Sequence, residues 1–175
     1  DGDWSGYSWH HSGYEHHAWQ PLPGPEGPTH IRDGETFIVE RSPESAIEIR
    51  QVEGGAHGAH CLEIANRDPA RWAGMGQYGL ILEPNETYRF RGRLKSLRDA
   101  PAEAELRIYA QGEWSAPVAA AALGPIGVED AERKAEFSSG AFGGRAVFAL
   151  WLSPGAIVQA DAFSLMPAKT IHGWK

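Results

Sequence analysis

The sequence predicts an all-β fold, an antiparallel β-sandwich of the jelly-roll type, on three observations. Short segments with alternating apolar and polar residues recur along most of the 175 residues. The 21 glycines and 12 prolines separate these segments at turn positions. Helical periodicity is poor, and only 118–123 is expected to form a short helix. Evenly spaced strands with turn residues between them are typical of sandwiches, and the length suits one domain with a buried core.

About nine strands are expected. They share period-two alternation or a short apolar run bounded by glycine or proline, and they are 36–40, 46–50, 60–65, 77–82, 86–95, 103–109, 132–137, 145–152 and 157–165. In 46–50, Ile47 and Ile49 alternate with Glu48 and Arg50, as in an antiparallel strand with one buried face.

The segment 86–95 is the most informative strand. Its alternation places apolar residues on one side, namely Tyr88, Phe90 and Leu94, and cations on the other, namely Arg89, Arg91, Arg93 and Lys95. In a chain with a net charge of -7, this row of cations is a local exception. Two interpretations of this row are left, a ligand-binding surface and an ordinary solvent-exposed sheet face.

Residues 1–30 differ in kind from the rest. They carry five aromatic residues with little alternation, namely Trp4, Tyr7, Trp9, Tyr14 and Trp19. Disordered segments are poor in aromatic residues, so we expect an arm that packs on the sandwich. The pairs His10-His11 and His16-His17 could indicate a zinc or nickel site. Neighbouring residues of an extended chain point to opposite sides, however, which favours a structural or solvent-facing role.

Composition excludes several classes of protein. The acidic balance argues against a general nucleic-acid binder, and no segment approaches the roughly 18 apolar residues of a membrane helix. Cys61, the single cysteine, excludes an internal disulfide, and its apolar neighbours predict a buried thiol. The sequence contains no Gly-x-Ser-x-Gly elbow, phosphate loop or His-Glu-x-x-His helix.

The C-terminal region carries a resemblance to a known family. Asp161–Pro167, read as Asp-Ala-Phe-Ser-Leu-Met-Pro, is followed by Thr170–Gly173, and Ala65–Arg67, Gly74–Leu82 and Thr87–Phe90 lie upstream. These segments resemble the carbohydrate-binding-module-like sandwich attached to α-L-arabinofuranosidases of glycoside hydrolase family 51 and their relatives. The resemblance covers Phe37 to Gly173 and implies a jelly roll of the galactose-binding-like type.

The same resemblance implies a division of the chain. Residues 1–30 would be an arm packed on the sandwich, 31–167 a carbohydrate-binding module, and 168–175 the start of a linker to a catalytic domain outside this chain. The parent enzyme would be secreted, periplasmic or attached to the cell surface. The paired carboxylates of glycoside hydrolysis would lie outside the chain, which is therefore expected not to be an enzyme.

Three functions are open. The first is a monomeric, non-catalytic module that binds a plant, algal or microbial polysaccharide, with no nucleic-acid or membrane partner. The second is a structural accessory domain of a glycosidase, with no sugar affinity of its own. The third is a small hydrolase or metal-dependent enzyme built on the histidine pairs.

Sugar binding requires aromatic rings and hydrogen-bonding groups on an exposed surface. The residues that offer them are Arg89, Arg91, Arg93, Arg107, Tyr109, Glu105, Trp114 and Trp72. If 86–95 and 103–109 are neighbours in one sheet, their polar faces form one continuous patch, with the tryptophans in loops beyond it. Trp151 is expected in the core, although the face that it shares with Val147 and Ala149 could be the concave one.

The charge of the ligand is left open. A stripe of cations would attract an acidic polysaccharide, such as a uronate-containing or sulfated chain. Neutral arabinan or arabinoxylan is the competing class, because Glu48, Glu103 and Glu105 could pair with the arginines. The family resemblance also implies a structural calcium ion with Asp161 among its ligands, while no other cofactor is required.

Overall fold

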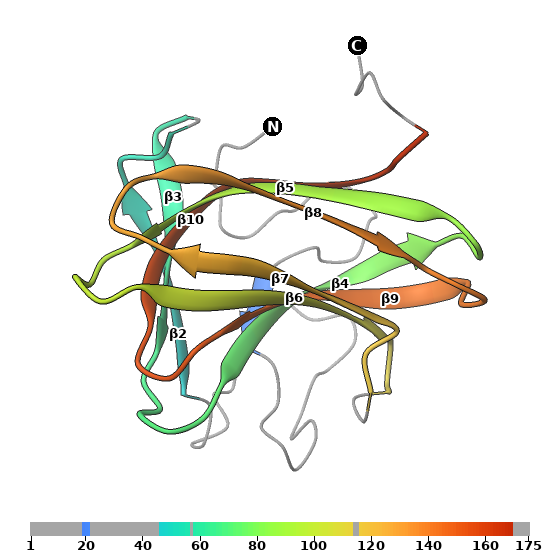
Figure 1. Cartoon of the computed structure of the whole chain (residues 1–175), viewed down its shortest axis with the longest axis horizontal. Coiled ribbons are helices and arrows are strands. Elements are labelled where there is room, and N and C mark those ends of the chain that lie inside the picture. The colour runs from blue at the N-terminus through green and yellow to red at the C-terminus, as the bar shows by residue number, and fades with distance from the viewer. Residues whose placement is uncertain (1–18, 22–45, 57, 114–115, 170–175) are drawn as a thin grey trace.

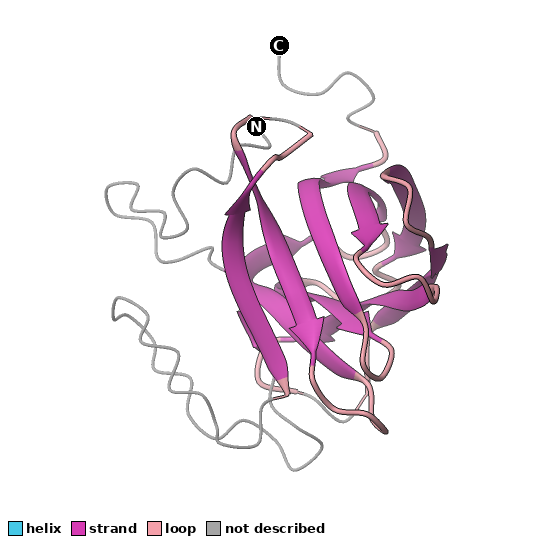
Figure 2. Cartoon of the chain, turned by 90° about the vertical axis from the view of Figure 1, so that its left-hand side faces the viewer, coloured by secondary structure: helices cyan, strands magenta, loops and turns pink. Residues whose placement is uncertain are grey.

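The computed structural model describes residues 19–21, 46–56, 58–113 and 116–169. These residues form two five-stranded antiparallel sheets and no helix (Figures 1 and 2). Sheet A has the order β1-β4-β9-β6-β7, and sheet B has the order β2-β3-β10-β5-β8. The predicted antiparallel β-sandwich is therefore confirmed. Within the described ranges there is no helix of the length and apolar character needed to span a membrane.

The two sheets lie face to face, with β5 and β8 above β6 and β7 in Figure 1. The strands of sheet A are β1 (Trp19–Pro21), β4 (Ala73–Leu82), β9 (Gly144–Leu152), β6 (Ala102–Ala110) and β7 (Ala119–Ile126). The strands of sheet B are β2 (Ile47–Glu53), β3 (His60–Asn66), β10 (Ile157–Pro167), β5 (Thr87–Ser96) and β8 (Ala131–Ser138). From β3 onward most connections cross from one sheet to the other.

The predicted strands from 46–50 to 157–165 all occur, and that at 77–82 begins earlier, at Ala73. The predicted strand 36–40, both histidine pairs and most of the predicted arm lie outside the described residues. Of the arm, the structure describes only β1, which pairs with β4 so that Trp19 lies opposite Gln77.

The predicted short helix at 118–123 is wrong, because this segment forms β7. Its alanines favour a helix in isolation. Pairing with β6, however, gives the backbone a ladder of hydrogen bonds and places Ala120 opposite Arg107. The same strand buries Leu123 and Ile126 in the core. Tertiary burial therefore outweighs local propensity here.

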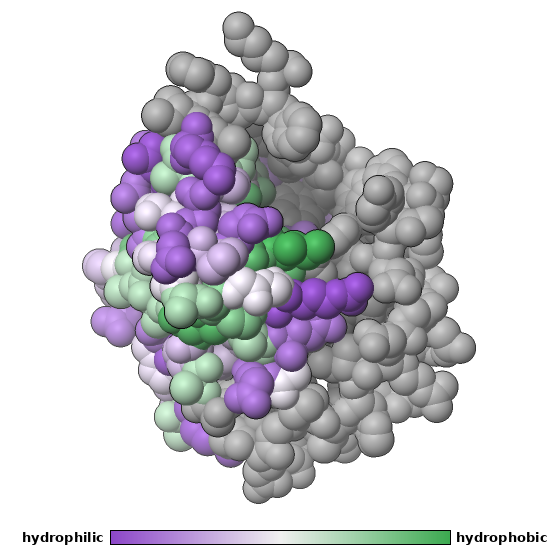
Figure 3. Space-filling view, turned by 90° about the vertical axis from the view of Figure 1, so that its right-hand side faces the viewer, coloured by the Kyte–Doolittle hydropathy of each residue, from purple (hydrophilic) through white to green (hydrophobic). Residues whose placement is uncertain are grey.

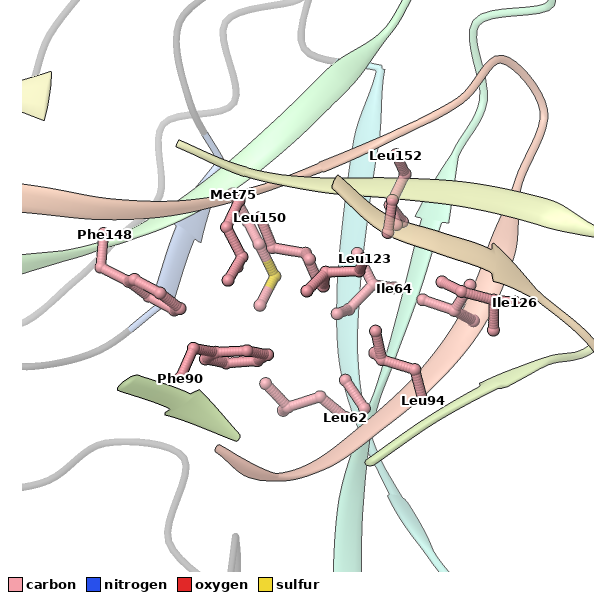
Figure 4. Close-up of a cluster of buried hydrophobic side chains, with 14 of the residues drawn as sticks. Leu62, Ile64, Met75, Phe90, Leu94, Leu123, Ile126, Phe148, Leu150 and Leu152 are labelled. Atoms are coloured by element: carbon pink, nitrogen blue, oxygen red, sulfur yellow. The ribbon is translucent and has the colours of Figure 1, made fainter. Parts of the chain in front are cut away.

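The main core lies between the sheets (Figure 4). Phe90 from sheet B meets Phe148 from sheet A, with ring centroids 5.4 Å apart. The apolar side of β5 is buried as predicted. Cys61 is also buried. Burial first, and then the charges of nearby carboxylates, raise the pKa of the Cys61 thiol above its ordinary value, so the protonated, unreactive form is favoured.

The described surface is mixed in character. On the side shown in Figure 3, hydrophilic and hydrophobic residues are interspersed. The large hydrophobic side chains that are exposed come from four separate segments, and they are Trp72, Ile81, Leu97 and Val128. Scattered apolar residues of this kind are normal on a protein surface.

A β-bulge in β10 depends on Gly92 of β5. The register of the two strands shifts between Asp161 and Ser164. Within the bulge, the ring of Phe163 packs edge-on against Phe90, with centroids 5.2 Å apart. A Cβ atom at Gly92 would lie 2.4 Å from the Phe163 ring. Phe163 thus occupies the space that any side chain at position 92 would need.

Gly92→Ala is expected to lower the free energy of unfolding by about 1–3 kcal/mol, because the new methyl group overlaps a packed ring. Urea denaturation followed by tryptophan fluorescence measures this loss. Gly127→Ala is the matched control: no atom lies within 4 Å of a Cβ at that position, so a change below about 0.5 kcal/mol is expected. A Gly92→Ala protein as stable as the control would contradict the packing described.

Candidate functional site

The condition for one continuous polar patch is not met, because the two strands that would form it lie in different sheets. β5 belongs to sheet B and β6 to sheet A. The alternate residues of both strands fill the core, so the polar residues lie on outer faces. The first set, on sheet B, is Arg89, Arg91 and Arg93, and the second set, on sheet A, is Glu105, Arg107 and Tyr109. The sandwich separates the two sets.

The cations of sheet B are accompanied by carboxylates. Arg89 pairs with Glu136 on the neighbouring strand β8, and Nη2 of Arg93 lies 2.8 Å from Oδ2 of Asp130. The hydrogen bond and charge of Asp130 raise the pKa of Arg93 above its ordinary value. Exposed pairs of this kind add little stability. They do turn the predicted cationic stripe into a surface of mixed charge.

The outer face of sheet A gathers side chains from β6 and β9. The register places Glu105 opposite Trp151, Arg107 opposite Ala149, and Tyr109 opposite Val147. We call these residues the Trp151 face. Their lateral neighbours are small: on β4 and β7 they are Gly74, Gly76, Ala120 and Ala122. The longer side chains of the face therefore stand between positions with little or no side chain.

Arg107 is the best-positioned polar group of this face. Its Cζ atom lies 4.7 Å from the centroid of the Trp151 ring, within cation–π distance. Its Nη2 and Nε atoms donate to Oε2 of Glu105 at 2.7 and 3.2 Å. Burial by itself lowers the pKa of Arg107, but hydrogen bonds with Glu105 and Tyr109 outweigh burial and raise the pKa above its ordinary value. Arg107 is thus charged and held in one orientation.

Two polar atoms near this face are buried without a hydrogen-bond partner among the described residues. They are Nε1 of Trp151 and Oε1 of Gln111, which follows β6. An unbonded buried group costs about 1–3 kcal/mol. Such atoms are therefore candidates for bonds to a ligand or to ordered water.

Part of the Trp151 face is closed to solvent. Tyr109, which the sequence predicted to be exposed, is only 3% exposed, and Val147 and Ala149 are fully buried. With Trp151 they form a second hydrophobic cluster, separate from the main core. The prediction that Trp151 lies in the core between the sheets is therefore wrong. Trp151 is half-buried on the outer face of sheet A. This agrees with the alternative, in which Trp151, Val147 and Ala149 lie on a face outside the core.

Trp151 is thus a candidate binding residue that the sequence prediction did not include. The signal for it is the alternation of β9, which places Trp151 with Val147 and Ala149 and opposite to Phe148. In a strand that is apolar on both sides, alternation cannot tell which side meets the other sheet.

The two predicted loop tryptophans have different outcomes. Trp72 is 37% exposed and immediately precedes β4. Because Ala73 lies opposite Leu152, Trp72 lies at the same end of sheet A as Trp151. Trp114 lies outside the described residues. Trp72 is accordingly placed to extend the aromatic surface at this end.

Asn66 fixes the loop that carries Trp72. This asparagine is 1% exposed. The two N–H groups on its Nδ2 atom donate to three carbonyl oxygens, those of Arg71 at 2.9 Å, Leu152 at 3.1 Å and Ser153 at 3.0 Å, so that two of these oxygens share one N–H. Its Oδ1 atom accepts a bond from the backbone N–H of Asp68 at 3.0 Å. One side chain thereby joins the loop to the end of β9.

Asp161, the predicted calcium ligand, is buried in the bulge of β10 and accepts a bond from the N–H of Ala162 at 2.7 Å. Within the described ranges, no group of three or more histidine, cysteine, aspartate or glutamate side chains is arranged to hold a metal ion. Calcium binding at Asp161 stays a prediction.

Comparison with known proteins shows the fold. No protein-family model matches the chain, and no curated protein matches it significantly. A solved structure of the CBM22-1 and GH10 modules of xylanase Xyn10B from Clostridium thermocellum, complexed with xylohexaose, is 14% identical, with a TM-score of 0.56. The match covers 71% of this chain and 25% of that chain.

Two further structures are single modules. The CBM22-1 xylan-binding domain of Xyn10C from Paenibacillus barcinonensis is 17% identical over 69% of this chain and 81% of that chain, with a TM-score of 0.53. A CBM4 structure is 15% identical over 68% of this chain and 77% of that chain, also with a TM-score of 0.53. The chain has the β-sandwich fold of carbohydrate-binding modules. Its predicted attachment to a family 51 enzyme stays a prediction.

Asn66→Asp is expected to lower the free energy of unfolding by about 3 kcal/mol, because a carboxylate cannot donate to three carbonyl oxygens and repels them instead. Thermal unfolding at pH 7, followed by circular dichroism, measures the loss. The control is Asn85→Asp in the β4–β5 turn, where φ is +55° and aspartate is tolerated. Equal stability of the two variants would show that Asn66 does not hold the loop.

Proposed function

We propose that this chain is a non-catalytic module that binds a polysaccharide without net charge at the open part of the Trp151 face. The observation that carries the proposal is the guanidinium of Arg107, held between the Trp151 ring and the Glu105 carboxylate on a sheet face outside the core. An aromatic surface beside oriented donors and acceptors is the combination that sugar recognition requires.

The Arg107–Glu105 pair retains capacity for a ligand. Both side chains are 28% exposed. Glu105 uses Oε2 for both bonds to Arg107, and Oε1 can accept a sugar hydroxyl. A guanidinium has five N–H donors, and only part of them bond Glu105 and Tyr109. Because these side chains are already ordered, little conformational entropy is lost when they bind a ligand.

The charges favour a neutral ligand. On sheet A, the positive charge of Arg107 is neutralised by the carboxylate of Glu105. On sheet B, the cations Arg89 and Arg93 already pair with carboxylates. A uronate or sulfate group would have to displace these partners. Structures with this fold include one complexed with xylohexaose and one described as xylan-binding. Xylan is therefore the first ligand to test, and arabinan follows from the family resemblance.

In this proposal the module belongs to a longer glycoside hydrolase that acts outside the cell, with the catalytic domain after residue 175. The chain itself would be a monomer without a catalytic role.

One observation favours a second function, the structural accessory domain. Tyr109, Val147 and Ala149 are buried on the side of sheet A that faces away from the core. Because these residues are covered within the chain itself, this part of sheet A serves internal packing and not ligand binding, as expected of a domain whose role is structural.

Native gels cast with xylan, arabinoxylan, arabinan or polygalacturonate test the proposal. Retardation by a neutral polysaccharide is expected, with little dependence on salt, because the ligand carries no net charge. Arg107→Met is expected to weaken retardation at least about tenfold, or roughly 1.4 kcal/mol. Methionine keeps an apolar stem against Trp151, so the midpoint of thermal unfolding should move by only a few degrees.

Arg91→Met is the matched control, since it removes an arginine from the outer face of sheet B. Unchanged retardation is expected for this variant. Retardation by polygalacturonate alone, lost in Arg91→Met and in high salt, would place binding on sheet B instead. No retardation by any polysaccharide would favour the structural accessory domain.

A further inference from the structure

We propose that the loop 67–72 adds an outer subsite to the Trp151 face, in which the ring of Trp72 stacks on a further sugar unit of the bound chain. This subsite depends on the proposed function, because it extends the same site past β4. Three features of the loop support it, namely the side of the sheet on which Trp72 lies, its exposure, and the hydrogen bonds that order the loop.

Trp72 lies on the same side of sheet A as Trp151. Ala73 lies opposite Leu152 and packs against the main core. Alternation therefore turns Trp72 and Gly74, on either side of Ala73, away from the core. Because Gly74 lies opposite Trp151, Trp72 and Trp151 are diagonal neighbours, a separation that aromatic side chains can bridge. Neither strand places a side chain between them, since residue 74 is a glycine.

The two tryptophans are the open part of this end of the face. Gly74 is buried, whereas Trp72 is 37% exposed and Trp151 is half-buried. Ile81 of the same strand is more exposed still, but it lies opposite Arg145 at the far end of β4. Trp72 thus differs from an isolated apolar residue, because it adjoins a second ring and a polar pair. A large, flat ring at such a place offers contact area to a ligand.

Hydrogen bonds order the loop that carries this ring. Oδ1 of Asp68 accepts the backbone N–H groups of Ala70 at 2.8 Å and Arg71 at 2.9 Å. Oδ2 of Asp68 accepts a bond from Nε of Arg71 at 2.8 Å, and the carbonyl oxygen of Asp68 accepts the N–H of Gly155 at 2.9 Å. Together with the bonds of Asn66, they fix the backbone up to the residue before the ring. Little conformational entropy is therefore lost when the ring binds a ligand.

The arrangement sets where a bound chain continues. The Arg107–Glu105 pair lies on β6, on one side of Trp151, and Trp72 lies before β4, on the other side. A neutral chain that binds at the pair and at Trp151 can continue to Trp72, where the exposed Arg71 adds donors for its hydroxyls. A disaccharide fills only the inner part of this site, and a longer chain fills both parts.

Titration calorimetry with oligosaccharides of two to six units tests the proposal. The probes are β-1,4-xylo-oligosaccharides and α-1,5-arabino-oligosaccharides. For the unchanged protein we expect one series to bind, with an association constant that rises at least about tenfold from two to six units. Trp72→Ala is expected to reduce that rise to less than about twofold. The disaccharide should bind this variant as it binds the unchanged protein, because the inner residues are intact.

Two further variants are controls. Trp72→Phe keeps an aromatic ring and is expected to retain most of the dependence on chain length. Ile81→Ala removes an apolar side chain that is 71% exposed on the same strand, and it should bind oligosaccharides of every length as the unchanged protein does. Circular dichroism verifies that all variants are folded.

The two proposals fail in different ways. Unchanged hexasaccharide binding in Trp72→Ala, together with loss of binding in Arg107→Met, would overturn the outer subsite and leave sugar binding at the Trp151 face intact. An equal loss of disaccharide and hexasaccharide affinity in Trp72→Ala would also overturn a separate subsite. The same would follow if the unchanged protein bound all lengths equally. Absence of binding to every oligosaccharide and every polysaccharide would overturn both proposals.

Discussion

The rest of the structure depends on the burial of β9 on both of its faces. β9 lies between β4 and β6 in sheet A, and from Ala146 to Leu152 only Trp151 is not buried. Its inward residues, such as Phe148 and Leu150, fill the main core (Figure 4). Its outward residues Val147 and Ala149 belong to the second cluster. A strand enclosed in this way holds its neighbours in fixed positions, because a shift of register would move every side chain to the wrong face.

The candidate site is built outward from this strand. Trp151 lies where β9 begins to meet solvent, and its ring supports the guanidinium of Arg107. Arg107 in turn orients Glu105, its neighbour two residues away on the same face of β6. The loop before β4 is tied to the end of β9 through Asn66. The aromatic ring, the ion pair and the loop are therefore positioned by one rigid element, as a preorganised binding site requires.

The outer faces of the two sheets use arginine in different ways. On sheet B, arginines pair with carboxylates across neighbouring segments, and the Arg89 and Glu136 side chains are 48% and 58% exposed. Exposed pairs of this kind contribute between about 0 and 1 kcal/mol and chiefly maintain solubility. On sheet A, Arg107 is partly buried and stacked on a ring. Arginine that is both stacked and hydrogen-bonded is oriented for recognition, which is why the proposed binding site is on sheet A.

The sequence by itself determined most of the described strands and, within most of those, which residues share a face. Tyr88, Phe90 and Leu94 are buried as predicted, because side-chain alternation is a local property of an extended chain. Local pattern carries no information about which strands pair, so the separation of Arg91 and Arg107 onto different sheets was decided by the tertiary structure. The strand at 119–126 and the outward position of Trp151 were decided in the same way. In both segments the partner strand and the side that meets the other sheet come from long-range packing, which outweighs propensity and cannot be read from alternation alone.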